Sequence, residues 1–208
     1  MTNKPTGHIL AAMSKREDKK LEIIQKSSEI MYLKGYNATG VQELADAANI
    51  PKGSFYNYFK SKEDFAIELM DSYCAMGCQL MSEILEDKSL SPLKRIEKLF
   101  SGMIEYFTKD AKFQKGSFVG NLCQEMGDTN ISISKAADRS FEHMKEPIIK
   151  LLHEAQDAGE ISKKHDVEDL AEFILISKEG ALLRMKSSKN AKPLKVFQDM
   201  IMKLLLMK

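Results

Sequence analysis

A run of basic, hydroxyl and amide side chains between Lys52 and Lys62 is the part of this 208-residue chain best suited to bind another molecule. Within it, Ser54, Tyr56 and Asn57 carry groups that can hydrogen-bond base edges and phosphates. The flanking lysines can neutralise phosphate charge. The run therefore predicts a surface that binds a nucleic acid, and these residue types leave open the alternative of a surface turn between two core helices.

Two short helices are predicted to position this run. Apolar residues recur at helical spacing before it and form one face: Val41, Leu44, Ala45 and Ala48. Pro51 then breaks the pattern, because proline disfavours helical geometry at the residue before it. The second helix begins near Lys52 and buries Phe55 and Phe59, which lie four residues apart and share a face. Two short helices joined by a tight turn form a helix-turn-helix, which places its second helix in the major groove.

From about Lys19 to Tyr73 the chain resembles, without a gap, the DNA-binding domain of TetR/AcrR-family regulators. The resemblance rests on three segments: Gly35-Tyr36-Asn37-Ala38-Thr39, Leu44-Ala45-Asp46-Ala47-Ala48, and Pro51-Lys52-Gly53-Ser54-Phe55-Tyr56-Asn57-Tyr58-Phe59-Lys60-Ser61-Lys62-Glu63. It implies DNA contacts from two sets of residues: Thr39, Gly40 and Gln42 at the start of the first short helix, and Lys52, Gly53, Ser54, Tyr56, Asn57, Tyr58, Lys60 and Lys62 in and after the second. Many relatives have Ser or Thr where Gly40 stands, so a contact there would use its amide.

Helical periodicity continues through the rest of the chain, and no useful length of β-like alternation interrupts it. We predict an all-α fold of about nine helices: a three-helix helix-turn-helix head followed by a helical body. Residues 1–14 are predicted to be a flexible N-terminus, residues 15–62 the DNA-binding domain (the head) and residues 63–208 the ligand-binding and dimerisation domain (the body). The helix after Ser61 is predicted to link the two, with an apolar stripe of Phe65, Leu69, Tyr73, Met76 and Leu80.

The last two helices are too apolar for the surface of a monomer, since Phe173 to Ile176 place apolar side chains on every side of one turn. We therefore predict a homodimer, and the resemblance agrees, because family members dimerise through their last two long helices. A homodimer would present two recognition helices to a palindromic operator. The residues predicted to form this interface are Phe173, Ile174, Phe197, Met200, Ile201, Leu204 and Leu205.

The resemblance also implies a small-molecule pocket among the middle helices, whose occupation moves the linking helix. Met and Phe suit an adaptable apolar pocket, although plain core is the alternative for each of them. The candidates are Met103, Phe107, Phe118, Leu122, Phe141 and Met144. One branch of the family carries Gly-Cys-Leu-x-Gly-Asn-Leu and Glu-Gly-Ala-Leu-Leu-Arg-Met-Lys, to which 116–122 and 179–186 correspond here. Ser117 stands at the cysteine position, so a thiol sensor does not carry over.

The three cysteines suggest other chemistry only weakly. Cys123 lies near Glu125, which leaves a thiol enzyme as the least favoured alternative. Cys74 and Cys78 share one side of a helix, but no further Cys or His follows at ligand spacing, so no metal site and no cofactor are expected. An odd number of cysteines in a chain of this length indicates a reducing compartment rather than a disulfide framework.

Composition is that of an ordinary globular protein, 43% hydrophobic and 29% charged, with no apolar run long enough to span a membrane. The N-terminus does not read as a signal peptide, so we expect a cytoplasmic protein. The net charge is +1, but residues 1–62 hold 10 basic and 6 acidic residues, which gives +4, and the remainder carries −3. A basic head on a mildly acidic body suits a nucleic-acid-binding protein.

Together these features predict a transcriptional regulator rather than an enzyme. It would be a repressor that binds a palindromic operator as a homodimer and is released by a small apolar or reactive molecule. An all-α interaction protein that binds no DNA is the main alternative. That alternative would leave the basic, aromatic helix-turn-helix unexplained.

Overall fold

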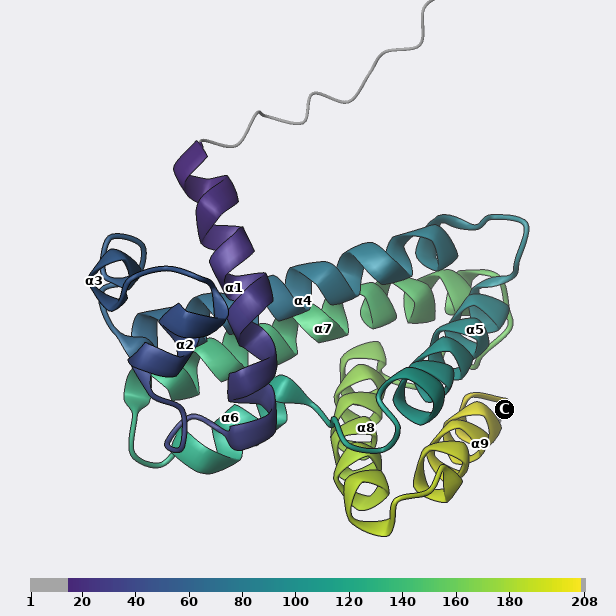
Figure 1. Ribbon diagram of the computed structural model, residues 1–208. Coiled ribbons are helices and arrows are strands. Elements are labelled where there is room, and N and C mark those ends of the chain that lie inside the picture. The colour runs from purple at the N-terminus through teal and green to yellow at the C-terminus, as the bar shows by residue number, and fades with distance from the viewer. Residues whose placement is uncertain (1–14, 207–208) are drawn as a thin grey trace, which may run out of the picture.

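The structure, a computed structural model, describes residues 15–206, so the predicted flexible N-terminus (1–14) and Met207 lie outside the described residues. Within this range the chain forms nine α-helices and a π-helical segment and contains no strand, which confirms the all-α prediction (Figure 1). Their bounds are α1 Lys15–Lys34, α2 Val41–Ala47, α3 Lys52–Phe55, α4 Lys62–Glu86, α5 Pro92–Glu105, η1 Tyr106–Asp110, α6 Phe118–Met126, α7 Ile131–Asp157, α8 Val167–Ser188 and α9 Lys192–Leu206.

Local sequence signals set the ends of the first helices. Gly35 ends α1 with a φ of 86°, in the left-handed region that favours glycine. Asn49 ends α2 with a φ of 54°, and the Ile50 amide donates to the Ala45 carbonyl at 3.0 Å across the turn. Pro51 then occupies the N-cap position of α3. The tight turn of the helix-turn-helix thus combines a left-handed asparagine with a proline.

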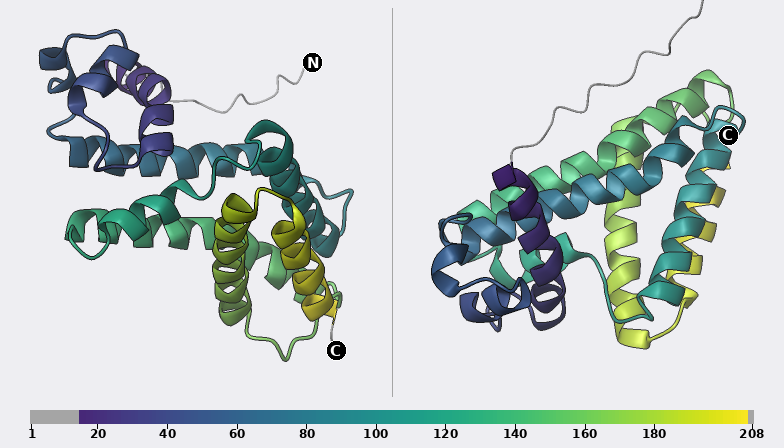
Figure 2. Two further views of the ribbon diagram at one scale, coloured as in Figure 1. Left: turned by 60° about the horizontal axis from the view of Figure 1, so that its bottom comes forward. Right: turned by 45° about the horizontal axis from the view of Figure 1, so that its top comes forward.

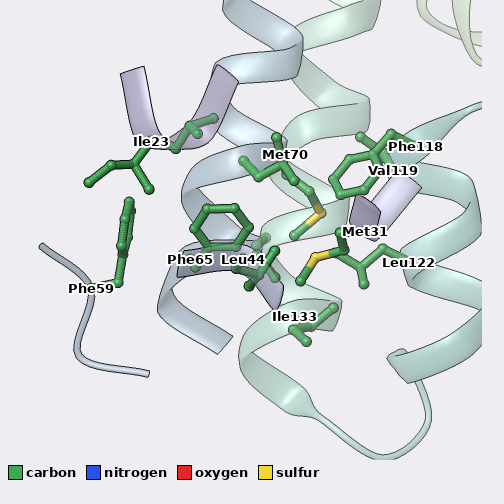
Figure 3. Packing of buried hydrophobic residues seen from close by; sticks show 14 of the residues in the cluster. Ile23, Met31, Leu44, Phe59, Phe65, Met70, Phe118, Val119, Leu122 and Ile133 are labelled. Atoms are coloured by element: carbon green, nitrogen blue, oxygen red, sulfur yellow. The ribbon is translucent and has the colours of Figure 1, made fainter. Parts of the chain in front are cut away.

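Three phenylalanines form the centre of the first hydrophobic cluster, and all are fully buried: Phe55, Phe59 and Phe65. The ring centroids of Phe59 lie 5.0 Å from those of both Phe55 and Phe65. Figure 3 shows that side chains of α6, among them Phe118 and Leu122, join the same cluster. The head is therefore packed against α4, α6 and α7, and its core crosses the predicted boundary at residue 62.

The long helices α4 and α7 lie side by side and carry the remaining helices of the body (Figures 1 and 2). At their far end a second cluster joins α5, α7, α8 and α9, where the rings of Phe100 and Phe197 lie 5.0 Å apart. Beside it Arg95 is buried, and its guanidinium donates to the Leu85 carbonyl at 2.7 Å and to the Glu154 carboxylate. This ion pair ties α4, α5 and α7 together.

The predicted apolar stripe of α4 is wrong in its second half. Met76 and Leu80 are 55% and 75% exposed. The inward face instead continues through Cys74, which is buried, and Met81, which packs against the second cluster. The face that α4 buries is set by where α5 and α7 lie, and the spacing of apolar residues alone did not contain that information.

No helix among residues 15–206 is both long enough and apolar enough to span a membrane.

Candidate functional site

The outward face of α3 and of the turn after it carries the polar run between Lys52 and Lys62. Lys52, Gly53, Tyr56, Asn57 and Lys60 are exposed, whereas the neighbouring Phe55 and Phe59 are fully buried. Ser54 and Tyr58 are half-buried. The alternation of buried aromatic and exposed polar residues holds the polar groups outward on a rigid base.

The start of α1 is joined to this surface. The Arg16 guanidinium donates to the Asn57 carbonyl at 2.9 Å, and the Lys20 ammonium lies 5.3 Å from the centroid of the Phe59 ring. The Arg16 contact brings one α1 cation beside the exposed face of α3, whereas the Lys20 ammonium is paired with the Glu68 carboxylate beside the buried Phe59 ring.

Four of the predicted DNA-contacting residues are engaged within the protein. Thr39 is 1% exposed and its hydroxyl donates to the Gly35 carbonyl at 2.6 Å, so its side chain does not face outward as predicted. The Lys62 ammonium donates to the carbonyls of Tyr36 and Thr39 at 2.9 and 3.0 Å and is not turned towards solvent as predicted. Both side chains hold the turn between α1 and α2.

Gly40 and Gln42 are exposed at the start of α2, but their polar groups already have partners. The Gly40 amide donates to the Glu43 carboxylate at 3.0 Å, and the Gln42 side-chain amide donates to Asp46 at 2.7 Å. A contact from either residue would have to share or replace these bonds. Both residues are exposed, and the polar groups of both already form hydrogen bonds.

A cavity of about 340 Å³ lies between α6 and α8. Its polar lining comes from both helices and includes Asn121, Gln124, Glu179 and Lys186. Its apolar lining includes Phe141, Leu182 and Leu183. A cavity of this size falls in the range that small-molecule sites occupy.

Of the six residues predicted to line a pocket, Phe141 alone lines this cavity. Phe118 and Leu122 are buried in the first cluster, against which Met144 packs, and Phe107 is buried in a third cluster, which Met103 contacts. The six residues do not line one shared cavity in the structure, because their helix faces turn towards different clusters. A signal for the observed lining was present, since the segments 116–122 and 179–186 supply most of it.

The cavity presents an acceptor and a donor group from α8, Glu179 and Lys186. Glu179 Oε1 is buried without a hydrogen-bond partner, and although the Lys178 ammonium lies 3.2 Å away, it is not in hydrogen-bonding geometry. The Lys186 ammonium makes one long contact, 3.4 Å, to the Asn121 side-chain oxygen. A ligand with a hydrogen-bond donor would satisfy Glu179, because an unpaired buried acceptor is costly.

The thiol that lines this cavity is not activated. Burial raises the pKa of Cys123, and the carboxylates of Asp128, Asp138 and Glu179 raise it further. The neighbouring carboxylate of Glu125 accepts hydrogen bonds from the amides of Tyr36 and Asn37. A nucleophilic cysteine needs the opposite shift, so this arrangement does not support the thiol-enzyme alternative.

The other two cysteines lie on α4, and burial raises the pKa of both Cys74 and Cys78. Cys74 Sγ contacts the Ser140 carbonyl at 3.8 Å. No group of three or more His, Cys, Asp or Glu side chains that could hold a metal ion occurs in the range 15–206.

The predicted interface residues divide between two faces of α8 and α9. Phe173 and Met200 are 51% and 58% exposed, as an interface with a second copy requires. The others face inward within one chain: Ile174, Phe197, Ile201 and Leu205 are buried in the second cluster, and Leu204 is half-buried against it. Both helices are apolar on two sides. Residue type alone did not indicate which side packs against other helices of the same chain. Further exposed apolar residues on these helices are Ile176, Leu183 and Val196.

Comparison with known proteins covers both halves of the chain. Residues 23–69 match the family model of bacterial regulatory proteins of the tetR family, and residues 92–201 match the tetracyclin repressor-like C-terminal domain. The transcriptional regulator AcuR of Cereibacter sphaeroides is 39% identical over 84% of this chain and 80% of its own. The HTH-type transcriptional repressor DhaR of a Mycobacterium species is 33% identical over 88% of this chain and 90% of its own.

Solved structures show the same architecture. The crystal structure of a regulatory protein TetR from Rhodobacter sphaeroides superimposes with a TM-score of 0.80, at 36% identity over 88% of this chain and 96% of that one. The reduced form of NemR from Escherichia coli also reaches 0.80, at 22% identity over 88% of this chain and 95% of that one, and so shares the fold.

Proposed function

This chain belongs to the TetR family of bacterial regulatory proteins and is a ligand-responsive, DNA-binding transcriptional regulator, and on that premise we propose that it is a repressor released from its operator by a small molecule. The observation that carries the proposal is the exposed polar face of α3, held outward by the buried Phe55 and Phe59. The name of one relative, a transcriptional repressor, supports the direction of control.

The DNA contacts would come from the residues that the structure leaves exposed or half-exposed. Tyr56 and Asn57 would meet base edges, with Gly53 allowing close approach of the backbone, because a Cβ built there meets nothing within 4 Å in the free protein. Lys52 and Lys60 would neutralise phosphates. Ser54 and Tyr58 would lie at the margin of the groove, and Gly40 and Gln42 would contact the phosphate backbone beside it. Because its proposed partner is bacterial DNA, we infer that the protein acts in the cytoplasm.

A second copy would bind along α8 and α9. The exposed Phe173, Ile176, Val196 and Met200 give these two packed helices an apolar outer side. Apolar surface of this kind on a regulator marks a contact with another protein. A two-fold dimer would set two α3 helices on the half-sites of a palindromic operator.

The effector would occupy the cavity between α6 and α8. We infer a small molecule whose apolar part rests on Phe141, Leu182 and Leu183 and whose hydrogen-bond donor reaches Glu179. The proposal rests on Glu179 Oε1, which is buried with an ion pair to Lys178 but without a hydrogen bond, since a bound donor would supply that bond. No further cofactor is invoked.

The experiment that tests the proposal is selection of short genomic fragments by the purified protein at near-physiological salt. We expect enrichment of a palindrome whose half-sites lie about one helical turn apart. Tyr56→Ala combined with Asn57→Ala should then weaken binding to that palindrome by about a hundredfold, because each base contact contributes roughly 1–3 kcal/mol.

The matched control is Gln79→Ala, an exposed side chain on α4. Both proteins should keep the melting temperature and the oligomeric state of the wild type. Unfolding or dissociation of the Tyr56/Asn57 variant would contradict the placement of these side chains in the groove. Absence of any enriched sequence, also after refolding to remove co-purified ligand, would contradict the repressor itself.

A further inference from the structure

The carboxylate of Glu125 on α6 holds the turn that joins α1 to α2. One of its oxygens accepts from the Tyr36 amide and the other from the Asn37 amide, each at 2.7 Å. Bonds from amides to an ionised acceptor are among the stronger hydrogen bonds in proteins. The Asn37 side chain adds a contact to the sulfur of Met126, the last residue of α6, at 3.4 Å. The C-terminal end of α6 therefore anchors this turn.

The turn is shaped around that carboxylate. A Cβ placed on Gly35 would lie 2.7 Å from Glu125 Oε2, closer than real side-chain contacts come. The φ of 86° at the same residue also requires glycine. The backbone thus approaches the carboxylate at the one position where a side chain would obstruct it.

The same turn sets the start of the helix-turn-helix. The Thr39 hydroxyl closes it onto the Gly35 carbonyl, and the Lys62 ammonium from α4 binds its Tyr36 and Thr39 carbonyls. Gly40, the next residue, is the N-cap of α2. Because α6 holds two amides of the turn and α4 holds two of its carbonyls, release of Glu125 would free α2 on one side while α4 still holds the other.

The N-terminal part and outer side of α6 line the cavity between α6 and α8. Gly120, Asn121, Cys123 and Gln124 supply that wall, and Glu125 follows directly. In a single nine-residue helix these residues move together. Displacement of α6 by about one ångström would take both 2.7 Å bonds beyond hydrogen-bonding distance.

We propose that Glu125 is the positioning residue that transmits occupation of the cavity to the DNA-binding head, directly through the turn between α1 and α2. This inference rests on the proposed function and deepens it. It assigns the coupling to α6 and the turn, without requiring a movement of α4. With Glu125 bonded to both amides the turn holds α2 in place for DNA, and a ligand that pushes α6 releases both amides.

The test uses N-ethylmaleimide at Cys123 as a probe that fills the cavity, in a protein with Cys74→Ala and Cys78→Ala. The thiol adds across the maleimide double bond, and mass spectrometry confirms one adduct. Hydrogen exchange of the Tyr36 and Asn37 amides is measured with and without the adduct, and the Ile50 amide, which donates to Ala45, serves as the internal reference. Affinity for the selected operator is measured on the same samples.

In the Glu125-containing protein the adduct should speed exchange of both amides and weaken operator binding by about tenfold or more, the usual range of coupling between sites. Glu125→Gln and Glu125→Ala should show fast exchange before modification, and the adduct should then add little to either readout. Asp128→Asn, which removes an exposed carboxylate just beyond α6, should respond as the parent does.

A full response of operator affinity to the adduct in the Glu125 variants would overturn the proposal, since the coupling would then run by another route. Unchanged exchange at Tyr36 and Asn37 in the modified parent would overturn it as well. A protein that binds no operator would contradict the proposed function. The exchange measurement needs no DNA, so exchange of the Tyr36 and Asn37 amides would still test the role of Glu125.

Discussion

The head and the α8–α9 pair treat their apolar side chains in opposite ways. In the head, Phe55 and Phe59 are fully buried together with Phe65 of α4, and polar or basic groups remain outside. In α8 and α9, apolar residues point both inward, as Phe197 does, and outward, as Phe173 does. The head completes its core with side chains of α4, α6 and α7 from the same chain, and its polar surface is left for a charged partner. The α8–α9 pair presents a surface that only an apolar partner would cover.

The largest expected effect comes from breaking the core of the head. Phe59→Ala removes a fully buried ring that touches two others, and such a change costs about 3–5 kcal/mol in free energy of unfolding. Chemical denaturation monitored by circular dichroism measures the loss. Phe173→Ala, a ring of the same type that is 51% exposed, is the matched control. If both variants lost the same free energy of unfolding at a concentration where both are monomeric, the proposed contrast between a buried ring in the head and an exposed ring on α8 would be contradicted.

The second prediction breaks the outer side of α8 and α9 without touching their inner side. Phe173→Ser with Met200→Ser should weaken dimerisation by about a hundredfold, or ~3 kcal/mol, because a two-fold interface loses each side chain twice. Sedimentation equilibrium measures the change, and helix content should stay constant. Leu80→Ser on α4, at 75% exposure, is the control and should leave the dimer intact. An unchanged dimer in the double variant would place the interface elsewhere.

The third prediction concerns the ion pair beneath the α8–α9 region. The Arg95 guanidinium, and then Lys88, lower the pKa of Glu154, so the pair stabilises the fold above the ordinary carboxyl range. Stability should therefore fall as the pH drops through and below about 4.5, where Glu154 becomes protonated. Glu154→Gln should cost about 2 kcal/mol at pH 7 and flatten this part of the pH profile.

The matched change for that experiment is Asp157→Asn, an 81%-exposed carboxylate on the same helix. Denaturation at pH 7 and at pH 3.5 compares the variants. A pH dependence as steep in Glu154→Gln as in the wild type would show that other carboxylates carry it.

The smallest expected effect separates the charge-dependent DNA binding of the head from the apolar dimerisation of α8 and α9. Lys52→Ala should weaken DNA binding modestly and reduce the slope of log affinity against log salt by about one per half-site, since one phosphate contact is lost. Lys150→Ala, an exposed lysine on α7, should leave the slope unchanged. Dimerisation through apolar side chains should show little salt dependence in the same buffers. An unaltered slope for Lys52→Ala would remove this residue from the DNA surface.

The helix-turn-helix was predictable because short-range signals define it. Gly35, Asn49 and Pro51 end or begin helices by their own backbone preferences, and the four-residue spacing of Phe55 and Phe59 marks the buried face. The resemblance implied DNA contacts from Thr39 and Lys62. Their polar groups bind backbone that only the folded turn brings near.

The cavity was less predictable, since it lies between segments about 60 residues apart in the chain. Met and Phe content pointed to six residues, of which five fill or contact the hydrophobic clusters instead. The polar residues of 116–124 and 179–186 form the lining because α6 and α8 happen to face each other there. Residue type indicates what a side chain tolerates, and the packing of helices decides whether a space remains beside it.

The sequence by itself determined the helices, their ends and the polar outer face of α3, because backbone preferences and helical spacing act over a few residues. The tertiary structure alone decided which side of α4, α8 and α9 is buried and that Glu125 reaches the amides of Tyr36 and Asn37, 89 and 88 residues away. Contacts between distant segments depend on how whole helices pack, and a pattern read along one helix does not contain the position of its neighbour.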